Sequence, residues 1–298
     1  MIAFALRPRG SPEPSDSQHH DSVNDNEAAA ATVASVSKPV WNRDHISYSS
    51  ISLYRQCSLR FFFKYVAQLP EETISASFVF GKSIHRAVEF HYRELLAGGE
   101  AQSLDLLLQE FQAAWDEHPE DTITYPKSES RDSNGHLAGR LLRAFLESDL
   151  SRPVGRIIGI EEELRGCLID GVPDLLARLD LLTESDEAIT VTDFKTSRSA
   201  WSDEQAADAS EQLLLYGELV QRLLPDKPLH LEFLVATKTK EVAITRHVIP
   251  FDQQRLDRTK RIVERVWQAI SAEHYFPSPS PMNCAACPYR EPCRQWAG

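Results

Sequence analysis

Large apolar residues are scarce between Leu6 and residue 40, whereas from Ile46 onward they recur at regular intervals. The first stretch consists mainly of Pro, Ser, Asp, Asn and Ala. Such a composition buries too little apolar surface to offset the entropy that is lost on ordering. We therefore expect residues 1–40 to form a disordered tail and residues 41–298 to form a single domain. The chain has 298 residues, 42% of them hydrophobic, which is enough for a substantial core.

Apolar residues at intervals of three and four predict a series of helices. In the first of these segments Ser47 or Ser49 would be the N-cap, and Cys57 lies in the middle of the helix. We expect helices at about 50–66, 80–96, 103–115, 135–149, 206–224 and 251–272.

Alternating apolar and polar residues predict strands at 156–168, 229–237 and 241–249. They also predict a hairpin between Ala177 and Lys195, with a polar turn at Thr183–Ala188. The strand at 156–168 carries Glu161, Glu162 and Glu163. One of these carboxylates could approach a metal ion, but we favour a solvated acidic strand edge.

The hairpin carries two aspartates that can meet. Asp193 and Lys195 share a face of the second strand, and Asp180 on the first strand can lie opposite Asp193. Two carboxylates can hold a hard divalent cation, and a nearby ammonium can position water and offset phosphate charge. A hairpin with solvated charges is the alternative. We favour Asp180 over Asp174, which follows Pro173, because Asp174 lies about 20 Å further down the strand.

Two pairs of residues lie one helical turn apart. His85 and Glu89 share a face of the helix at 80–96, and Gln212 and Tyr216 share a face of the helix at 206–224. Such pairs are commonplace and weak by themselves. The Gly81–Ser83 segment lacks the earlier glycine of a phosphate-binding loop, so we expect no ATPase motor.

The net charge of −12 and the pI of about 5.3 disfavour a general nucleic-acid binder, because phosphate contacts depend on Lys and Arg. Global charge is nevertheless weak evidence, since an enzyme needs only a local basic track. The helix at 251–272 offers such a track, although a solvated face is its default interpretation. Its basic residues are Arg255, Arg258, Arg261 and Arg265.

No apolar run reaches the length of a membrane-spanning helix, and the N-terminus lacks the order of a secretory signal. We therefore expect a cytoplasmic protein without membrane association. The odd number of cysteines, clustered near the C-terminus, disfavours a disulfide scaffold.

The segment at 280–296 contains Cys284, Cys287 and Cys293, spaced so that the three thiols can face one centre. A fourth ligand is needed, and Cys57 is the candidate. Cys167 remains as a spare that we expect to be buried. The same four thiolates suit a structural zinc ion or a [4Fe-4S] cluster, and spacing alone does not separate the two.

Taken in order, these residues resemble the PD-(D/E)XK nuclease superfamily, in its RecB-like exonuclease branch. In that branch a strand of the type Gly-Arg-Ile-Asp precedes one of the type Asp-Tyr-Lys. The matching residues are Ala177 to Asp180 and Asp193 to Lys195, with Ala177 in place of the glycine. A Gly-x-x-x-His pattern ends at His85. The cysteine pattern is similar to that of AddB and of CRISPR adaptation nucleases, which favours an iron–sulphur cluster.

The resemblance implies an α/β fold with a restriction-endonuclease-like core, in which helices flank a central mixed β-sheet and a cluster joins the N- and C-terminal segments. It implies that His85, Asp180, Asp193 and the backbone carbonyl of Phe194 bind Mg²⁺ or Mn²⁺. Lys195 would then orient the attacking water, while Gln212 and Tyr216 would contact the substrate. The [4Fe-4S] ligands would be Cys57, Cys284, Cys287 and Cys293.

The expected activity is metal-dependent exonuclease cleavage of DNA, on single strands or ends, in DNA repair, recombination or CRISPR spacer acquisition. Any unwinding would come from a partner, such as a helicase, a recombination protein or a CRISPR adaptation protein. A DNA-capture or scaffolding subunit without catalysis is the main alternative. A redox sensor with an incidental acidic hairpin is the more remote one.

Overall fold

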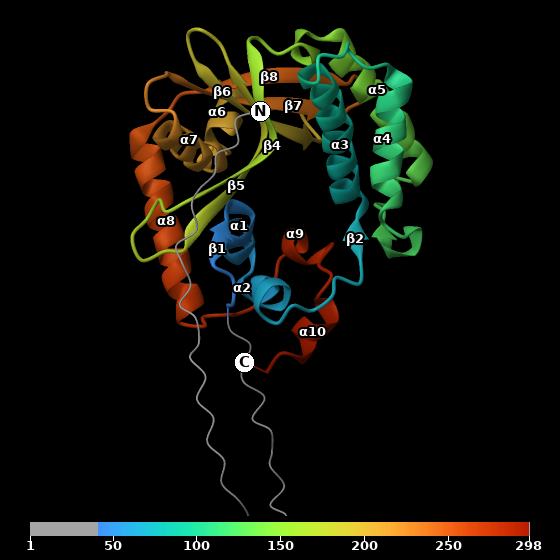
Figure 1. Ribbon diagram of the computed structural model, residues 1–298. Helices are drawn as coiled ribbons and strands as arrows, with labels where there is room; N and C mark the ends of the chain where they lie inside the picture. Colours follow the sequence, from blue (N-terminus) through green and yellow to red (C-terminus); the bar gives the residue numbers. More distant parts are fainter. Residues whose placement is uncertain (1–40, 298) are drawn as a thin grey trace, which may run out of the picture. The chain divides into compact units, whose positions relative to one another are not determined.

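A six-stranded mixed sheet lies at the centre of the computed structural model, which describes residues 41–297 (Figure 1). The prediction for residues 1–40 lies outside the described residues. The strand order is β1-β5-β6-β7-β8, and β4 pairs with β5 from outside this path. The strands are β1 (His45–Ser47), β4 (Arg156–Gly166), β5 (Asp174–Glu184), β6 (Ile189–Ser197), β7 (Leu229–Thr237) and β8 (Ala243–Ile249).

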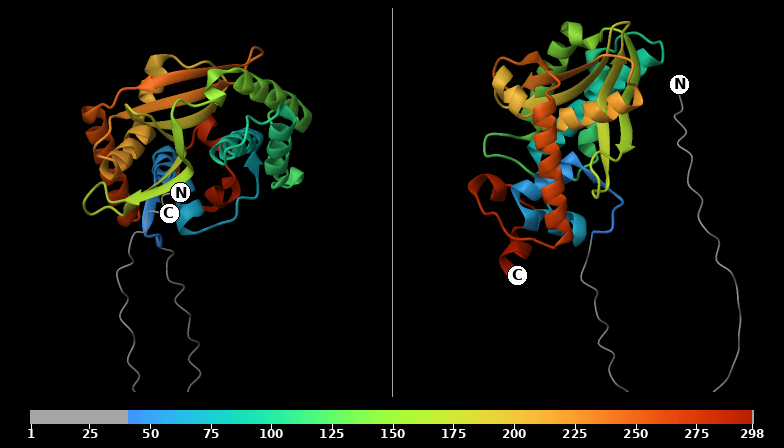
Figure 2. Two further views of the ribbon diagram at one scale, coloured as in Figure 1. Left: turned by 45° about the horizontal axis from the view of Figure 1, so that its top comes forward. Right: turned by 90° about the vertical axis from the view of Figure 1, so that its left-hand side faces the viewer.

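Helices cover both faces of the sheet (Figures 1 and 2). One face packs against α3 (Ala76–Leu96) and α5 (Arg131–Glu147), and α4 (Leu104–Asp116) packs on these two helices. The other face packs against α1 (Tyr48–Gln56), α7 (Glu211–Leu223) and α8 (Gln253–Ser271). The predicted α/β architecture with a mixed sheet between helices is confirmed.

The alternation of side chains along each strand separates the two cores. Along β7, Leu231, Phe233 and Val235 point into the core beneath α7. The next residue, Ala236, packs with Phe194 into the core beneath α3 and α5. Both faces of the central parallel pair, β6 and β7, are therefore covered and contribute apolar side chains to a core.

Strand β5 forks the sheet. Its C-terminal half pairs with β6, beginning with Leu181 opposite Thr192 and ending with Glu184 opposite Ile189. Its N-terminal end, from Asp174 to Leu176, pairs with β1. Between these two ladders the same edge of β5 has no strand partner among the described residues. The β5–β6 ladder therefore ends at Leu181 and Thr192, and the side chains just beyond this pair can form a site.

The structure corrects several local predictions. Ser47 is the N-cap of α1, as one of the two predicted candidates. Cys57, however, does not lie within a helix, because its extended backbone (φ −162°, ψ 105°) separates α1 from α2 (Ser58–Phe61). The predicted helix at 206–224 is likewise divided, into α6 (Asp203–Asp208) and α7, with a break at Ala209 and Ser210.

The C-terminal segment packs against the start of the domain. Beyond α8 the chain forms two short helices, α9 (Pro281–Cys284) and α10 (Arg290–Gln295). Buried Tyr289 packs with Leu59 and Phe63, and its hydroxyl donates to the carbonyl of Leu69 at 3.2 Å. The segment is therefore held by protein contacts. A small parallel pair, β2 (Ile74–Ser75) and β3 (Ile123–Thr124), completes the fold.

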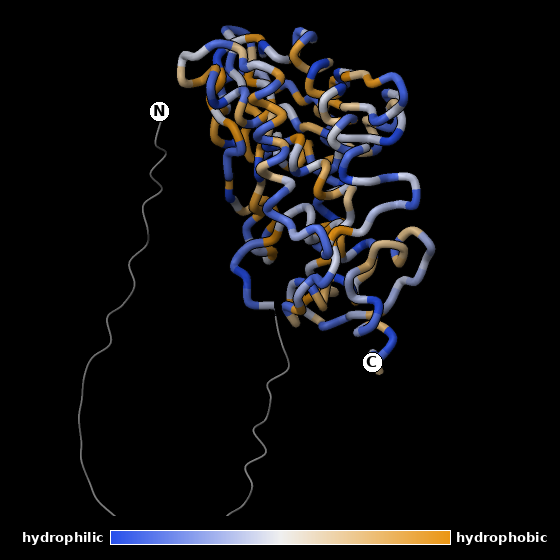
Figure 3. The backbone as a smooth tube through the Cα atoms, turned by 90° about the vertical axis from the view of Figure 1, so that its right-hand side faces the viewer, coloured by the Kyte–Doolittle hydropathy of each residue, from blue (hydrophilic) through white to orange (hydrophobic). Residues whose placement is uncertain are grey.

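Hydrophobic and hydrophilic stretches alternate along the backbone (Figure 3). Among residues 41–297, no helix combines the length and apolar character that crossing a bilayer requires.

Candidate active site

Asp180 and Asp193 come together where the β5–β6 ladder ends. The last pair of that ladder is Leu181 and Thr192, so the next positions in register are Asp180 and Asp193. The backbone N–H of Phe194 donates to Asp180 Oδ2 at 2.6 Å. A side chain thus replaces the next ladder bond, and this orients the Asp180 carboxylate. The hairpin geometry expected from the sequence is present.

Helix α3 brings His85 to the same place. Ser75 caps this helix by accepting a hydrogen bond from the backbone N–H of Phe78. Two turns later His85 Nδ1 lies 3.6 Å from Asp180 Oδ1, and its ring meets the Phe194 ring edge to face, with centroids 6.2 Å apart. The helical and the strand motifs therefore converge on one site.

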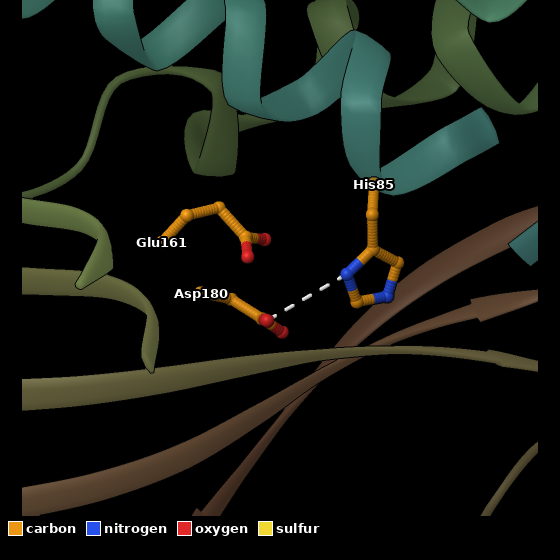
Figure 4. Close-up of side chains that lie close together, drawn as sticks. All are labelled: His85, Glu161 and Asp180. Carbon is orange, nitrogen blue, oxygen red and sulfur yellow. Dashed lines mark ion pairs between the residues drawn. The ribbon is translucent and has the colours of Figure 1, made fainter. Parts of the chain in front are cut away.

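Glu161 completes an acidic cluster that the sequence interpretation had not favoured. One ligand atom from each of His85, Glu161 and Asp180 lies within 4.8 Å of the others, and the three side chains point toward one another (Figure 4). Of the three neighbouring glutamates, Glu162 and Glu163 are exposed, as a solvated edge requires. For Glu161 that interpretation was wrong.

A local backbone feature explains the position of Glu161. Its φ of 49° is in the left-handed region, which costs a non-glycine residue about 1 kcal/mol or more. The neighbouring pairs Ile160–Leu181 and Glu162–Leu179 keep β4 aligned with β5 on either side. Glu161 is therefore held opposite Asp180. No pattern in the sequence signals this conformation, because Glu is not a residue that favours it.

The carboxylates of the cluster repel one another in a buried setting. Burial, together with Asp180 and Glu89, raises the pKa of Glu161 to about 7. Burial and Asp180 also raise the pKa of Asp193, against the opposing effect of Lys195. Burial alone would raise the pKa of Asp180, but His85, Lys195 and the Phe194 N–H together lower it. A bound cation would relieve this repulsion.

Lys195 is linked to both Asp193 and α7. Its Nζ lies 2.6 Å from Asp193 Oδ2 and donates to Gln212 Oε1 at 3.2 Å. Gln212 Nε2 in turn donates to the Tyr216 hydroxyl at 3.1 Å. Burial would lower the pKa of Lys195, but Asp193 and Asp180 raise it, so the side chain is a cation. All the predicted residues of this chain of contacts therefore lie together.

Asp174, the rejected candidate, lies elsewhere. It pairs in register with His45 at the other end of β5, and its carboxylate lies 3.1 Å from Arg165 Nε. It has no part in the acidic cluster.

The basic face of α8 is partly used for structure. Arg255 donates to the carbonyl of Ala207 and lies 3.5 Å from Asp208. The other three predicted arginines, Arg258, Arg261 and Arg265, line a surface hollow of about 380 Å³ together with Tyr54. Whether this face is a DNA track stays a prediction.

The four predicted cluster cysteines approach one another. Cys57, Cys287 and Cys293 pack around the same apolar group as Tyr289. Burial raises the pKa of the Cys293 thiol, and Cys57, Cys287 and Cys284 each add to that effect. Within residues 41–297, no three of these sulphurs lie within 4.8 Å of one another. Cys167, expected to be buried, is exposed, because it lies just after the end of β4.

The fold and the site define a class of protein, an α/β nuclease with carboxylates and a lysine at a forked sheet. The sequence model of the PD-(D/E)XK nuclease superfamily matches residues 45–294, and the chain belongs to that superfamily. Enzymes of this superfamily are hydrolytic nucleases that use divalent metals such as Mg²⁺. No curated protein sequence matches the chain.

Two solved structures are similar at low identity. A candidate exonuclease from Eubacterium rectale is 17% identical, with a TM-score of 0.40, over 78% of this chain and 91% of that one. The protein SSO0001 is also 17% identical, with a TM-score of 0.30, over 81% of this chain and 93% of that one.

Proposed function

We propose that this nuclease is a metal-dependent deoxyribonuclease of the RecB-like branch, an exonuclease acting on single-stranded DNA or DNA ends. The observation that carries the proposal is the meeting of His85, Glu161 and Asp180 within 4.8 Å, beside the ion pair of Asp193 and Lys195. Carboxylates and an imidazole suit Mg²⁺ or Mn²⁺, and a structural hairpin has no need of such a cluster.

His85, Asp180, Asp193 and the carbonyl of Phe194 would hold the cation, and the geometry adds Glu161 to this set. When bound, the cation supplies charge stabilisation at the phosphate and acidifies a water molecule. Lys195 would orient that water through its ammonium, which Asp193 and Gln212 hold in place. Gln212 and Tyr216, joined by a hydrogen bond, would position the substrate backbone.

The four predicted cysteines are suited to bind a second metal group, with a structural role. Cys57, Cys287 and Cys293 share one apolar environment, and Cys284 lies close enough to affect the pKa of Cys293. Among the described residues, no three of these sulphurs approach as closely as the ligands of a single zinc ion. This spacing favours a [4Fe-4S] cluster over zinc. Because the group would join the region of Cys57 to the segment at 280–296, its loss would cost folding as well as activity.

The proposed setting is DNA repair, recombination or CRISPR spacer acquisition in the cytoplasm. The chain offers no phosphate-binding loop at Gly81–Ser83, which instead lies inside α3. A helicase, a recombination protein or a CRISPR adaptation protein would then supply opened DNA.

Cleavage of end-labelled single- and double-stranded DNA tests the proposal. Anaerobically purified protein is assayed with Mg²⁺ or Mn²⁺ beside Asp193→Ala and Lys195→Ala. We expect metal-dependent cleavage that both substitutions abolish while the fold and the bound iron are retained. A folded wild-type protein that binds the metal yet leaves every substrate intact would contradict the catalytic proposal and favour a DNA-capture subunit.

A further inference from the structure

Helix α3 runs along β6, away from the catalytic cluster, and we call the line where the two elements meet the seam. Three neighbouring residue pairs define the seam. The His85 ring meets the Phe194 ring, a Cβ added at Gly81 would lie 3.5 Å from Thr196 Oγ1, and Arg198 Nη2 donates to Ser77 Oγ at 3.3 Å. Four helical residues rise about 6 Å and two strand residues about 6.6 Å, so helix and strand stay in step.

At its far end the seam brings Arg198 to Ser77, the residue before an exposed aromatic side chain. Phe78 follows Ser77, and 60% of its surface is exposed. The Arg198 side chain is 71% exposed, and its nearest carboxylate is Glu129 at 3.8 Å. Lys238 lies next to this point, because its backbone N–H donates to the carbonyl of Ser197 at 2.7 Å. Burial lowers the pKa of Lys238, and the neighbouring Arg198 lowers it further. The Lys238 ammonium lies 5.1 Å from the centroid of the Phe80 ring and has no ion pair within the described residues.

An exposed ring on the residue after the one that Arg198 contacts matches one kind of ligand. An unpaired base offers its face to an aromatic side chain, while the adjoining phosphates attract Arg and Lys. Bases within a duplex are already stacked, so they offer no such face.

We propose that Phe78, Arg198 and Lys238 form a subsite for the unpaired strand a few nucleotides from the scissile phosphate. Phe78 stacks on one base, and the two cations contact the backbone phosphates on either side. The inference rests on the proposed function, because the seam starts at His85 and Phe194 in the candidate catalytic site. The subsite names the residues that would make the enzyme prefer single strands over duplex DNA.

Binding without cleavage tests the subsite. The full-length protein is titrated into a fluorescent thymidine oligonucleotide, either single-stranded or annealed to its complement. EDTA is present to prevent cleavage. Phe78→Ala should weaken single-strand binding about 5- to 100-fold, the loss of one stacked base, and should leave duplex binding unchanged. Phe78→Trp should retain the wild-type affinity. Arg198→Ala should weaken binding and reduce its salt dependence.

Two matched controls lie at the other end of the sheet. Phe251 is 39% exposed and follows β8, whose last residue Ile249 pairs with Leu231 at the start of β7. The Arg156 side chain is 66% exposed and pairs with Glu184 beside the hairpin turn. Phe251→Ala and Arg156→Ala should bind like the wild type. A set of oligonucleotides, each with an abasic site at a different position, gives a further test. The wild type should bind one of them more weakly than the rest, whereas Phe78→Ala should bind all of them equally.

Each outcome decides the matter. Equal affinities for Phe78→Ala and Phe251→Ala, equal losses on single strand and duplex, or no binding of the oligonucleotide by the wild type would overturn the subsite. If the predicted losses occur but no DNA is cleaved with Mg²⁺ or Mn²⁺, the subsite stands and the catalytic proposal fails. The same oligonucleotide made of RNA separates a DNA subsite from a general single-strand subsite.

Discussion

The backbone N–H of Phe194 donates a hydrogen bond to Asp180 Oδ2 at 2.6 Å, just beyond the last paired residues of β5 and β6. The bond joins the two strands across the fork and fixes the carboxylate that also faces His85. Asp180 is thus both part of the sheet's hydrogen bonding and part of the candidate metal site. These two roles can be separated by substitution.

Asp180→Asn should separate them. Asn keeps an oxygen that can accept from the Phe194 N–H, so the free energy of unfolding should change by only about 1 kcal/mol. The lost charge should reduce metal-dependent cleavage by about a hundredfold or more. Denaturant unfolding and cleavage rates measure the two effects. Asp174→Asn, on the same strand but paired with Arg165, should retain full activity.

Glu161→Gln should stabilise the metal-free protein while weakening its affinity for metal. The Glu161 carboxylate is largely buried beside Asp180, and its pKa of about 7 shows that ionisation there is unfavourable. Neutralising it at pH 8 should add about 1–2 kcal/mol to the free energy of unfolding. Mn²⁺ affinity, measured by titration calorimetry, should fall about tenfold or more.

Glu162→Gln is the matched control for that pair of measurements, because Glu162 is adjacent and exposed. It should alter neither quantity. Equal metal affinities for the two variants would exclude Glu161 from the metal site.

Cys57→Ser should remove the proposed cluster. We expect loss of the brown colour, of bound iron and of acid-labile sulphide, with a lower melting temperature, because the group links distant parts of the chain. Exposed Cys167 offers the control, since Cys167→Ser should keep both iron content and stability. Metal analysis that finds one zinc ion per chain and no iron in the anaerobic wild type would replace the cluster with a zinc site.

His91 should make the protein sensitive to acid. Its ring is fully buried in α3, where Nε2 donates to the carbonyl of Ser151 at 2.8 Å and Nδ1 accepts from the Gln102 N–H at 3.4 Å. Burial lowers the pKa of His91. The unfolded chain therefore takes up this proton first as the pH falls, and the stability that His91 contributes above about pH 6.5 is lost below it.

His91→Gln tests this linkage, since Gln can make both hydrogen bonds but cannot titrate. Between pH 7 and pH 5, unfolding in urea should show the wild type losing about 1 kcal/mol more than the variant. His136→Gln, on an exposed position of α5, should behave like the wild type. Parallel pH curves for wild type and His91→Gln would contradict the prediction.

The sequence by itself determined most of the longer elements and the main catalytic candidates. Strand β7 spans the predicted residues, and Asp180, Asp193 and Lys195 lie where period-two alternation and a hairpin turn place them. These predictions depend on neighbours in the chain, and local geometry decides such neighbours. His85 and the pair Gln212 and Tyr216 were predicted by motif order, and the fold brings them to the same fork.

Only the tertiary structure decided the rest. Glu161 joins His85 and Asp180 because pairing of β4 with β5 holds it in a left-handed conformation that its residue type does not favour. Cys57 separates two helices where Ser58 and the N–H of Leu59 form hydrogen bonds with the backbone of Phe276, far along the chain. The seam that leads to Phe78 and Arg198 joins residues more than a hundred positions apart. Packing between distant segments, which no local pattern encodes, sets all three.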